Sequence, residues 1–338
     1  MNIQELETLP PPPGVFASLK AGFDVVSNRV ALILIPLGLD LLLWLGPRLS
    51  VDKLLSPVIK SLLSQVTQSM TGSDMEVFLH WQTQFLDKLQ DFNLLGLLSK
   101  PLWWFPVGIS SLSARTLPAT NPLNGPNSIA FSSMWILLGT VIVLIPLGWV
   151  GSGVFYRQVS RSIQSGDEAG VSLLRSIVQT VLLSVLCVMI LAVLFIPSSF
   201  IVGLLTIFSP LAANVVMLII FFLSFWLIVP LFFTPHGIFI RKQNALSSIL
   251  SSLRMIRFSL PTSGMFVLSV FILSRGLDIL WSAPKSESWL ALVGFAGHAF
   301  ITTALLAASF VYYRDMSNWL QTVYERFQQI KNRSSSKV

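Results

Sequence analysis

The chain has 338 residues, of which 53% are apolar and only 11% are charged, and its net charge is +7. The charged fraction is under half of the roughly 25% that is typical of soluble domains, and the mean hydropathy is +0.74. This composition excludes a disordered chain, a disulfide scaffold and an ordinary soluble enzyme, and it indicates a protein with much of its chain in lipid.

Six segments are long and apolar enough to cross a bilayer, whose hydrocarbon core of about 30 Å requires about 20 mostly apolar residues. They lie at 30–46, 132–156, 176–197, 211–233, 262–281 and 289–313. The predicted fold class is therefore all-α, a polytopic integral membrane bundle of six transmembrane helices. The apolar stretch 197–210 is too short to cross again, so we expect a tight connection there.

The spans divide the chain into segments with different expected roles. The first span reads as an uncleaved anchor, because 29 residues precede it and no small-x-small cleavage site follows it. The expected segments are a disordered tail at 1–13, an interfacial helix with the first span at 14–46, a loop at 47–131, the second span at 132–156, units of two spans each at 157–233 and 234–313, and a tail at 314–338.

Lys and Arg predict the orientation of the spans. With both termini inside, the cytoplasmic segments hold 14 Lys and Arg residues, whereas the short outer connections hold only Lys285. Positive charge accumulates on the cytoplasmic side of membrane proteins. We therefore expect a multi-pass protein with both its N-terminus and its C-terminus in the cytoplasm, and this accounts for the basic excess without a nucleic-acid partner.

Two pairs of similar short sequence segments indicate an internal duplication. Residues 38–44 resemble 276–281 at the outer ends of the first and fifth spans, and 154–160 resemble 311–317 at the ends of the second and sixth. Each outward-running span also follows a cytoplasmic amphipathic stretch with apolar spacings of three and four. We favour three copies of a unit with an interfacial helix, a span out and a span back over chance identity. The stretches are Phe16, Leu19, Phe23, Val26; Val171, Leu174, Ile177, Val178; and Ile249, Leu253, Ile256, Leu260.

The loop at 47–131 is expected to be the one sizeable aqueous segment. Two apolar helical stripes, separated by Gly72-Ser73, predict an extracytoplasmic helical hairpin, or two helices on the outer leaflet. Residues 100–106 are expected to form an interfacial elbow, and 118–127 a turn. The hairpin either caps the bundle or binds a membrane or extracytoplasmic protein partner through residues 51–105. The stripes are Val51, Leu54, Leu55, Val58, Ile59, Leu62, Leu63, Val66, and Phe78, Trp81, Phe85, Leu89, Phe92.

Motifs for catalysis, cofactors or metals are not found in the sequence. His80, His236 and His298 lie at different expected depths, so no shared metal site is predicted. Ser263 and His298 are separated by about 15 Å of depth at 1.5 Å per residue, which argues against a serine hydrolase pair. Cys187 is expected to be a small buried hydrophobe.

Charged residues within the spans form a candidate intramembrane polar cluster. A lone charge near the bilayer centre costs about 2.5–3.5 kcal/mol, so such residues usually pair or line a polar pathway. Asp278 can reach Arg275 at the i, i+3 spacing, and Asp40 can reach Arg275 if the first and fifth spans pack around one axis. His298 completes the cluster and is expected to donate to a nearby carbonyl. The cluster is either a structural ion pair or an outward-facing ion or headgroup site.

The residues that flank the spans resemble those of a known family. Ala17-Ser18-Leu19-Lys20 leads into the first span, and Tyr313-Arg314-Asp315 closes the sixth. With Pro235, Ala245-Leu246 and Leu253-Arg254 before the fifth span, the chain resembles the bacterial six-span proteins grouped with the membrane domain of glycerophosphoryl diester phosphodiesterases and with YciC-like inner-membrane proteins. The resemblance covers 14–47 and 132–315. It implies this fold in a bacterial plasma membrane and carries over no active-site residue.

The function expected from these features is that of a non-enzymatic integral membrane protein that is accessory to lipid or envelope processes, with membrane lipids as its partners. The alternative is a transporter or a permease-like subunit, which a polar cavity at mid-bilayer would favour. An intramembrane enzyme is the third possibility, and it lacks a converging nucleophile and base in the sequence.

Overall fold

The computed structural model describes residues 11–68, 72–100, 105–116, 120–123, 128–164 and 170–335. Most of the expected tail at 1–13, most of the elbow and parts of the expected turn lie outside these residues. The fold is all-α apart from one short pair of parallel strands, β1 (Arg48–Ser50) and β2 (Ser128–Ala130). Within the described ranges, five helices are long and apolar enough to span a membrane, or six if one bent pair counts as a single span.

The bent pair is the first span with its preceding helix. Helix α2 (Val15–Asn28) meets the following segment, a 3₁₀ turn (Val30–Ile33) and α3 (Leu34–Leu45), at 97°. The predicted apolar face of α2 is buried only in part. Leu19 and Val26 are buried, whereas Phe16 is exposed. An interfacial helix followed by a span is the arrangement that the sequence predicts for this unit.

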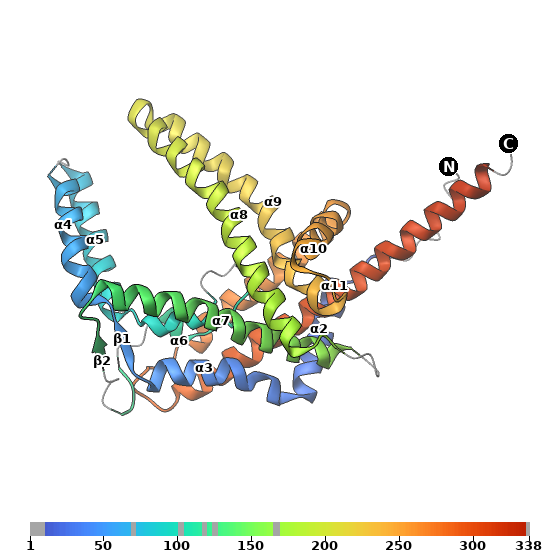
Figure 1. Cartoon of the computed structure of the whole chain (residues 1–338), viewed down its shortest axis with the longest axis horizontal. Helices are drawn as coiled ribbons and strands as arrows, with labels where there is room; N and C mark the ends of the chain where they lie inside the picture. Colours follow the sequence, from blue (N-terminus) through green and yellow to red (C-terminus); the bar gives the residue numbers. More distant parts are fainter. Residues whose placement is uncertain are drawn as a thin grey trace.

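Five longer helices complete the bundle (Figure 1). They are α7 (Met134–Ile163), α8 (Leu173–Phe208), α9 (Pro210–Ile240), α10 (Ala245–Trp281) and α11 (Ala291–Ser335). Helix α10 is broken at Ser259, two residues before Pro261, into an amphipathic first part and a spanning second part. Helix α8 is continuous from Leu173, so the middle unit has no separate interfacial helix.

A tight connection is present within 197–210, but it is a single residue, and the rest of this stretch is helical. Helix α8 continues through Pro197 to Phe208, and Ser209 alone separates it from α9, which has Pro210 in its first turn. The Ser209 hydroxyl caps α9 by accepting a hydrogen bond from the amide of Ala212 at 3.3 Å. The stretch is apolar throughout and so extends the helix, and the α8–α9 hairpin projects well beyond the rest of the bundle (Figure 1).

The predicted helical hairpin is present. Helices α4 (Asp52–Thr67) and α5 (Ser73–Asp91) pack together and stand apart from the long helices (Figure 1). Their stripes are not fully covered, because Val58, Leu62 and Trp81 remain exposed. The hairpin thus keeps an exposed apolar face.

The chain after the hairpin is not an aqueous loop, which corrects the sequence prediction. Residues 92–100 and 105–116, here called the inserted segment, pass between the long helices with a 3₁₀ turn (Leu94–Leu98) and the short α6 (Ser113–Thr116). A Cβ on Gly148 of α7 would lie 2.9 Å from the Leu98 carbonyl oxygen. Farther along α7, the Tyr156 hydroxyl donates to the Pro106 carbonyl at 3.0 Å. The inserted segment therefore follows α7 through most of its length.

Helix α11 is the centre of the bundle, since it contacts α2, α3, α7, α9 and α10. Small side chains on its buried face let α2 approach closely. A Cβ on Gly22 of α2 would lie 2.4 Å from the Ala308 nitrogen and 2.5 Å from the Ala304 oxygen. Close contacts between small residues are a common way to pack helices where the hydrophobic effect does not drive association.

We predict that Gly22→Ala destabilises the protein by about 1–3 kcal/mol, because the methyl group meets backbone atoms of α11 that cannot move aside. The matched control is Gly38→Ala in α3, where a Cβ has nothing within 4 Å. That change should leave stability unchanged or raise it by up to about 1 kcal/mol through helix propensity. Thermal unfolding of the purified variants in detergent measures both, and equal melting temperatures would contradict the packing.

Candidate functional site

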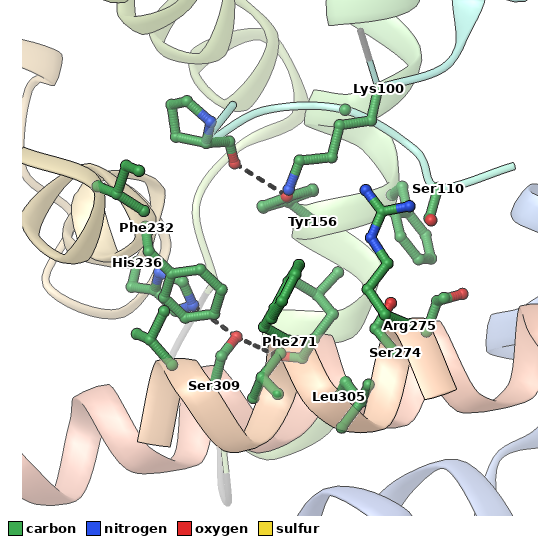
Figure 2. A pocket seen from close by; sticks show the side chains of 18 of the residues that line it. Lys100, Ser110, Tyr156, Phe232, His236, Phe271, Ser274, Arg275, Leu305 and Ser309 are labelled. Carbon is green, nitrogen blue, oxygen red and sulfur yellow. Dashed lines mark hydrogen bonds between the residues drawn. The ribbon is translucent and has the colours of Figure 1, made fainter. Parts of the chain in front are cut away.

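A cavity of about 120 Å³ lies between α7, α9, α10, α11 and the inserted segment (Figure 2). One part of its wall is apolar. The polar side chains come mainly from the inserted segment and from α10, with His236 and Ser309 on α9 and α11. The apolar lining includes Ile228, Phe232, Val267, Phe271 and Leu305. A cavity with an apolar wall and a few convergent polar groups is the usual form of a ligand site.

Three cationic side chains line this cavity: Lys100 and Arg115 from the inserted segment, and Arg275 from α10. Figure 2 shows Lys100 and Arg275 reaching into it. The lining residues include no carboxylate in the described part of the chain. The polar part of the cavity is therefore basic, with two guanidinium groups and the Lys100 amine, whose pKa is lowered to about 7 by burial and by these two groups.

His236 of α9 and Ser309 of α11 form a second polar contact on the cavity wall. The His236 Nε2 lies 2.7 Å from the Ser309 Oγ, and this hydroxyl also donates to the Leu306 carbonyl at 2.7 Å. Because the hydroxyl proton is used by Leu306, Nε2 of His236 is the donor to Ser309 in this arrangement. The pair joins α9 to α11 and supplies an imidazole edge to the cavity.

The predicted intramembrane cluster lies beside this cavity, and the structure brings its members together. Asp40 is completely buried on α3. Its Oδ1 accepts hydrogen bonds from the Ser111 hydroxyl at 2.6 Å and from the Ser113 amide at 2.9 Å. The inserted segment thus supplies two donors to the Asp40 carboxylate, and α6 begins at this point.

His298 of α11 lies between two carboxylates. Its Nδ1 is 3.5 Å from Asp40 Oδ2, and its Nε2 is 3.5 Å from Asp278 Oδ1. The expectation that His298 donates to a carbonyl is wrong, because both ring nitrogens face carboxylate oxygens. The imidazole connects α3, α10 and α11 at a position with almost no exposure.

Asp278 is the most highly connected member of the cluster. It forms an ion pair with Arg115 of the inserted segment, and the Arg275 guanidinium lies 4.0 Å from it on the same helix. Among the described residues no ion pair joins Asp40 to Arg275, so that part of the prediction is wrong and His298 takes the place of Arg275. Arg115 also donates to the Ser110 hydroxyl at 3.1 Å.

Sequence reasoning missed Lys100 and Arg115, because both were counted as loop charges. The signal that could have found them is the stretch 105–114, which is free of charge and rich in small and apolar residues. Such a composition is unusual for an aqueous loop and fits backbone buried among helices. Of the pair that was argued against, the Ser263 hydroxyl lies 2.9 Å from that of Ser259 and 3.2 Å from that of Tyr312, and the His298 ring faces Asp40 and Asp278.

Comparisons with known proteins do not identify the ligand or activity of this site. Neither the family models, nor the curated proteins, nor the solved structures contain a match to the chain. In the described ranges, no group of three or more His, Cys, Asp or Glu side chains is placed to hold a metal ion. The chemistry of the site is therefore argued from its own residues.

We predict that Asp40→Leu destabilises the protein strongly, because it leaves the Ser111 hydroxyl and the Ser113 amide buried without their acceptor. Each such group costs about 1–3 kcal/mol. Asp40→Asn keeps an oxygen in the same place and should cost less. The melting temperatures of the two variants in detergent test this order, and an Asn variant as unstable as the Leu variant would contradict the hydrogen-bonding role.

Proposed function

We propose that this membrane protein binds an anionic amphiphile, a lipid with a phosphate-containing headgroup, in the cavity between α7, α9, α10 and α11. The observation that carries the proposal is the convergence of Lys100, Arg115 and Arg275 on a cavity whose other wall is apolar. In this proposal the protein is accessory to a lipid or envelope process and carries out no covalent chemistry.

The charges of the site support an anion as the ligand. Arg115 and Arg275 share the carboxylate of Asp278, whereas Lys100 has no ion pair with a carboxylate in the described part of the chain. Burial and the nearby Arg115 and Arg275 lower the pKa of Lys100 to about 7, so a bound anion would stabilise the charged form of this amine. Guanidinium groups bind phosphate oxygens through paired hydrogen bonds, and an ammonium adds a point charge.

The aromatic and aliphatic wall supports an amphiphile over a free inorganic anion. Phe232, Phe271 and Leu305 face the same cavity as the cations (Figure 2). Apolar surface of this kind gains about 25 cal/mol for each Å² that it removes from water. A headgroup with its first chain carbons would use both walls, whereas free phosphate would use only one.

A transporter or permease-like subunit is the second candidate. The observation that favours it is the polar cavity itself, since substrate sites of transporters lie within the membrane domain, at charged groups between helices. Both candidates share the ligand chemistry, and they differ in whether the anion moves across the membrane. A flux assay in vesicles separates them.

The location, orientation and family of the protein are part of this proposal. We place it in a bacterial plasma membrane with both termini in the cytoplasm, supported by the Lys and Arg distribution. The relation to the six-span family with the phosphodiesterase membrane domain is supported by the flanking motifs and the helical architecture. The exposed face of the α4–α5 hairpin supports a lipid or extracytoplasmic protein contact within residues 51–105.

We predict that the purified protein binds short-chain phosphatidylglycerol, and that Lys100→Gln and Arg275→Gln each weaken binding about tenfold or more. Losing one charge-assisted hydrogen bond costs about 1.5–3 kcal/mol, and 1.4 kcal/mol is tenfold in affinity. Titration by fluorescence or calorimetry in a zwitterionic detergent measures this. The matched control is Arg254→Gln, which removes an exposed charge from α10 without touching the cavity.

Two further ligands identify the chemistry that is recognised. Glycerol phosphate carries the anion without the chains, and short-chain phosphatidylcholine carries the chains without a net charge. An amphiphile site binds phosphatidylglycerol best. Equal binding of glycerol phosphate would assign a soluble anion instead, and no binding of either anion would overturn the proposed function.

We predict that reporters placed after Arg241 and after Arg333 are cytoplasmic, and that a reporter after Gly72, between α4 and α5, is outside. The reason is the accumulation of Lys and Arg around the first two positions. Paired alkaline phosphatase and green fluorescent protein fusions in a bacterial host measure the side. A cytoplasmic signal after Gly72 would contradict the orientation.

A further inference from the structure

We propose that His298, held between Asp40 and Asp278, is a proton-binding site that is linked to the anion cavity. Uptake of one proton by this site strengthens anion binding, and anion binding in turn draws a proton from solution. The inference rests on the proposed function of the cavity, and it adds a second ligand, the proton, at a site 3.5 Å from two carboxylates.

The first step is the hydrogen-bond inventory of the imidazole. A neutral imidazole has one N–H donor and one bare nitrogen acceptor. His298 has a carboxylate oxygen 3.5 Å from each ring nitrogen, so in the neutral form one carboxylate faces a lone pair. Both nitrogens of His298 and the Asp40 Oδ2 are buried and lack a hydrogen-bond partner in the described structure. One added proton gives each carboxylate a donor.

The second step is the set of charges around this site. His298 faces Asp40 from α3 and Asp278 from α10, and Asp278 in turn faces Arg275 from α10 and Arg115 from the inserted segment. Two carboxylates and two guanidinium groups cancel. A proton on His298 therefore makes the whole cluster positive by one charge, adjacent to a cavity that also holds Lys100.

The third step connects the proton to the anion. Arg115 and Arg275 line the cavity and are at the same time the counter-charges of Asp278. A protonated His298 neutralises part of the Asp278 charge. The attraction between Asp278 and the two guanidinium groups is then weaker, so these groups bind an anion in the cavity more strongly. When His298 is neutral, Asp278 competes with the anion for the same guanidinium groups. Binding of proton and anion is thus mutually favourable, and thermodynamic linkage requires the effect to be equal in both directions.

The test uses phosphatidylglycerol, because its phosphodiester keeps one negative charge across the range in which an ordinary imidazole titrates, from about pH 5 to about pH 8. We expect the affinity of the wild-type protein to rise about 5-fold or more as the pH falls through this range, within the 5–150-fold typical of coupled sites. We also expect proton uptake when the lipid is added at constant ionic strength to a weakly buffered solution that contains a pH indicator.

The variants assign the proton to its site. The variants are made in a Lys100→Arg protein, because burial and the nearby Arg115 and Arg275 lower the pKa of Lys100 to about 7, and an arginine keeps its positive charge across this range. In that protein, His298→Gln should bind with an affinity that no longer depends on pH and without proton uptake. Asp278→Asn removes the carboxylate that competes with the anion, so it should bind tightly throughout the range. The controls are His236→Gln, which alters the other imidazole beside the cavity, and His80→Gln on α5. Both controls should keep the number of protons taken up per lipid bound, and His80→Gln, which lies outside the cavity, should also keep the affinity and its pH dependence.

Each outcome decides between the two proposals. Lipid binding that takes up no proton in the Lys100→Arg protein would overturn the proton site and leave the proposed function standing. Absence of lipid binding at every pH would overturn the proposed function. If proton uptake per bound lipid is lost in His236→Gln and kept in Asp278→Asn, the proton binds at His236 and not at His298, and the inference is refuted. This last comparison decides even if His298→Gln does not fold.

Discussion

An ionised side chain among membrane helices has to find its opposite charge locally, and this constraint explains the least regular part of the structure. Asp40 and Asp278 lie on different helices, and His298 alone cannot neutralise both. The inserted segment brings Arg115 to Asp278, and it brings a hydroxyl and an amide to Asp40. Because breaking a buried pair costs several kcal/mol, these contacts also stabilise non-helical backbone at a depth where it is otherwise unfavourable.

The spacing of the cluster depends on a close turn between α10 and α11. A Cβ on Gly294 would lie 2.3 Å from the Trp281 carbonyl oxygen, and one on Gly297 would lie 2.5 Å from the Trp281 ring. These two glycines let α11 start directly against the end of α10. Asp278 is one turn before Trp281, and His298 is the next residue after Gly297. The contact therefore sets the distance at which the imidazole meets the carboxylate.

The length of the apolar segments and their helical period predict three features of the fold. These are the spans, the α4–α5 hairpin, and the interfacial helix with the span that follows it in the first unit. It also identifies Asp40, Arg275, Asp278 and His298 as one cluster, because charges within spans are costly. It does not predict the pairing, since which carboxylate faces which cation depends on helix rotation and on the inserted segment. That segment has neither a helical nor a strand period, so the sequence signal for the depth of Arg115 is only the charge-free stretch 105–114 before it.

The balance of charge favours a ligand over a purely structural role for the cavity. The cluster of Asp40, Asp278, Arg115 and Arg275 is neutral by itself, and a bundle that needed only stability could stop there. Lys100 adds a third basic group that this network does not pair, and burial together with the two guanidinium groups lowers its pKa to about 7. Replacing buried charges by apolar groups is often neutral or stabilising, so stability alone gives no reason for a third cation. An anion that enters and leaves the cavity gives such a reason, because it completes the neutrality of the site only when it is bound.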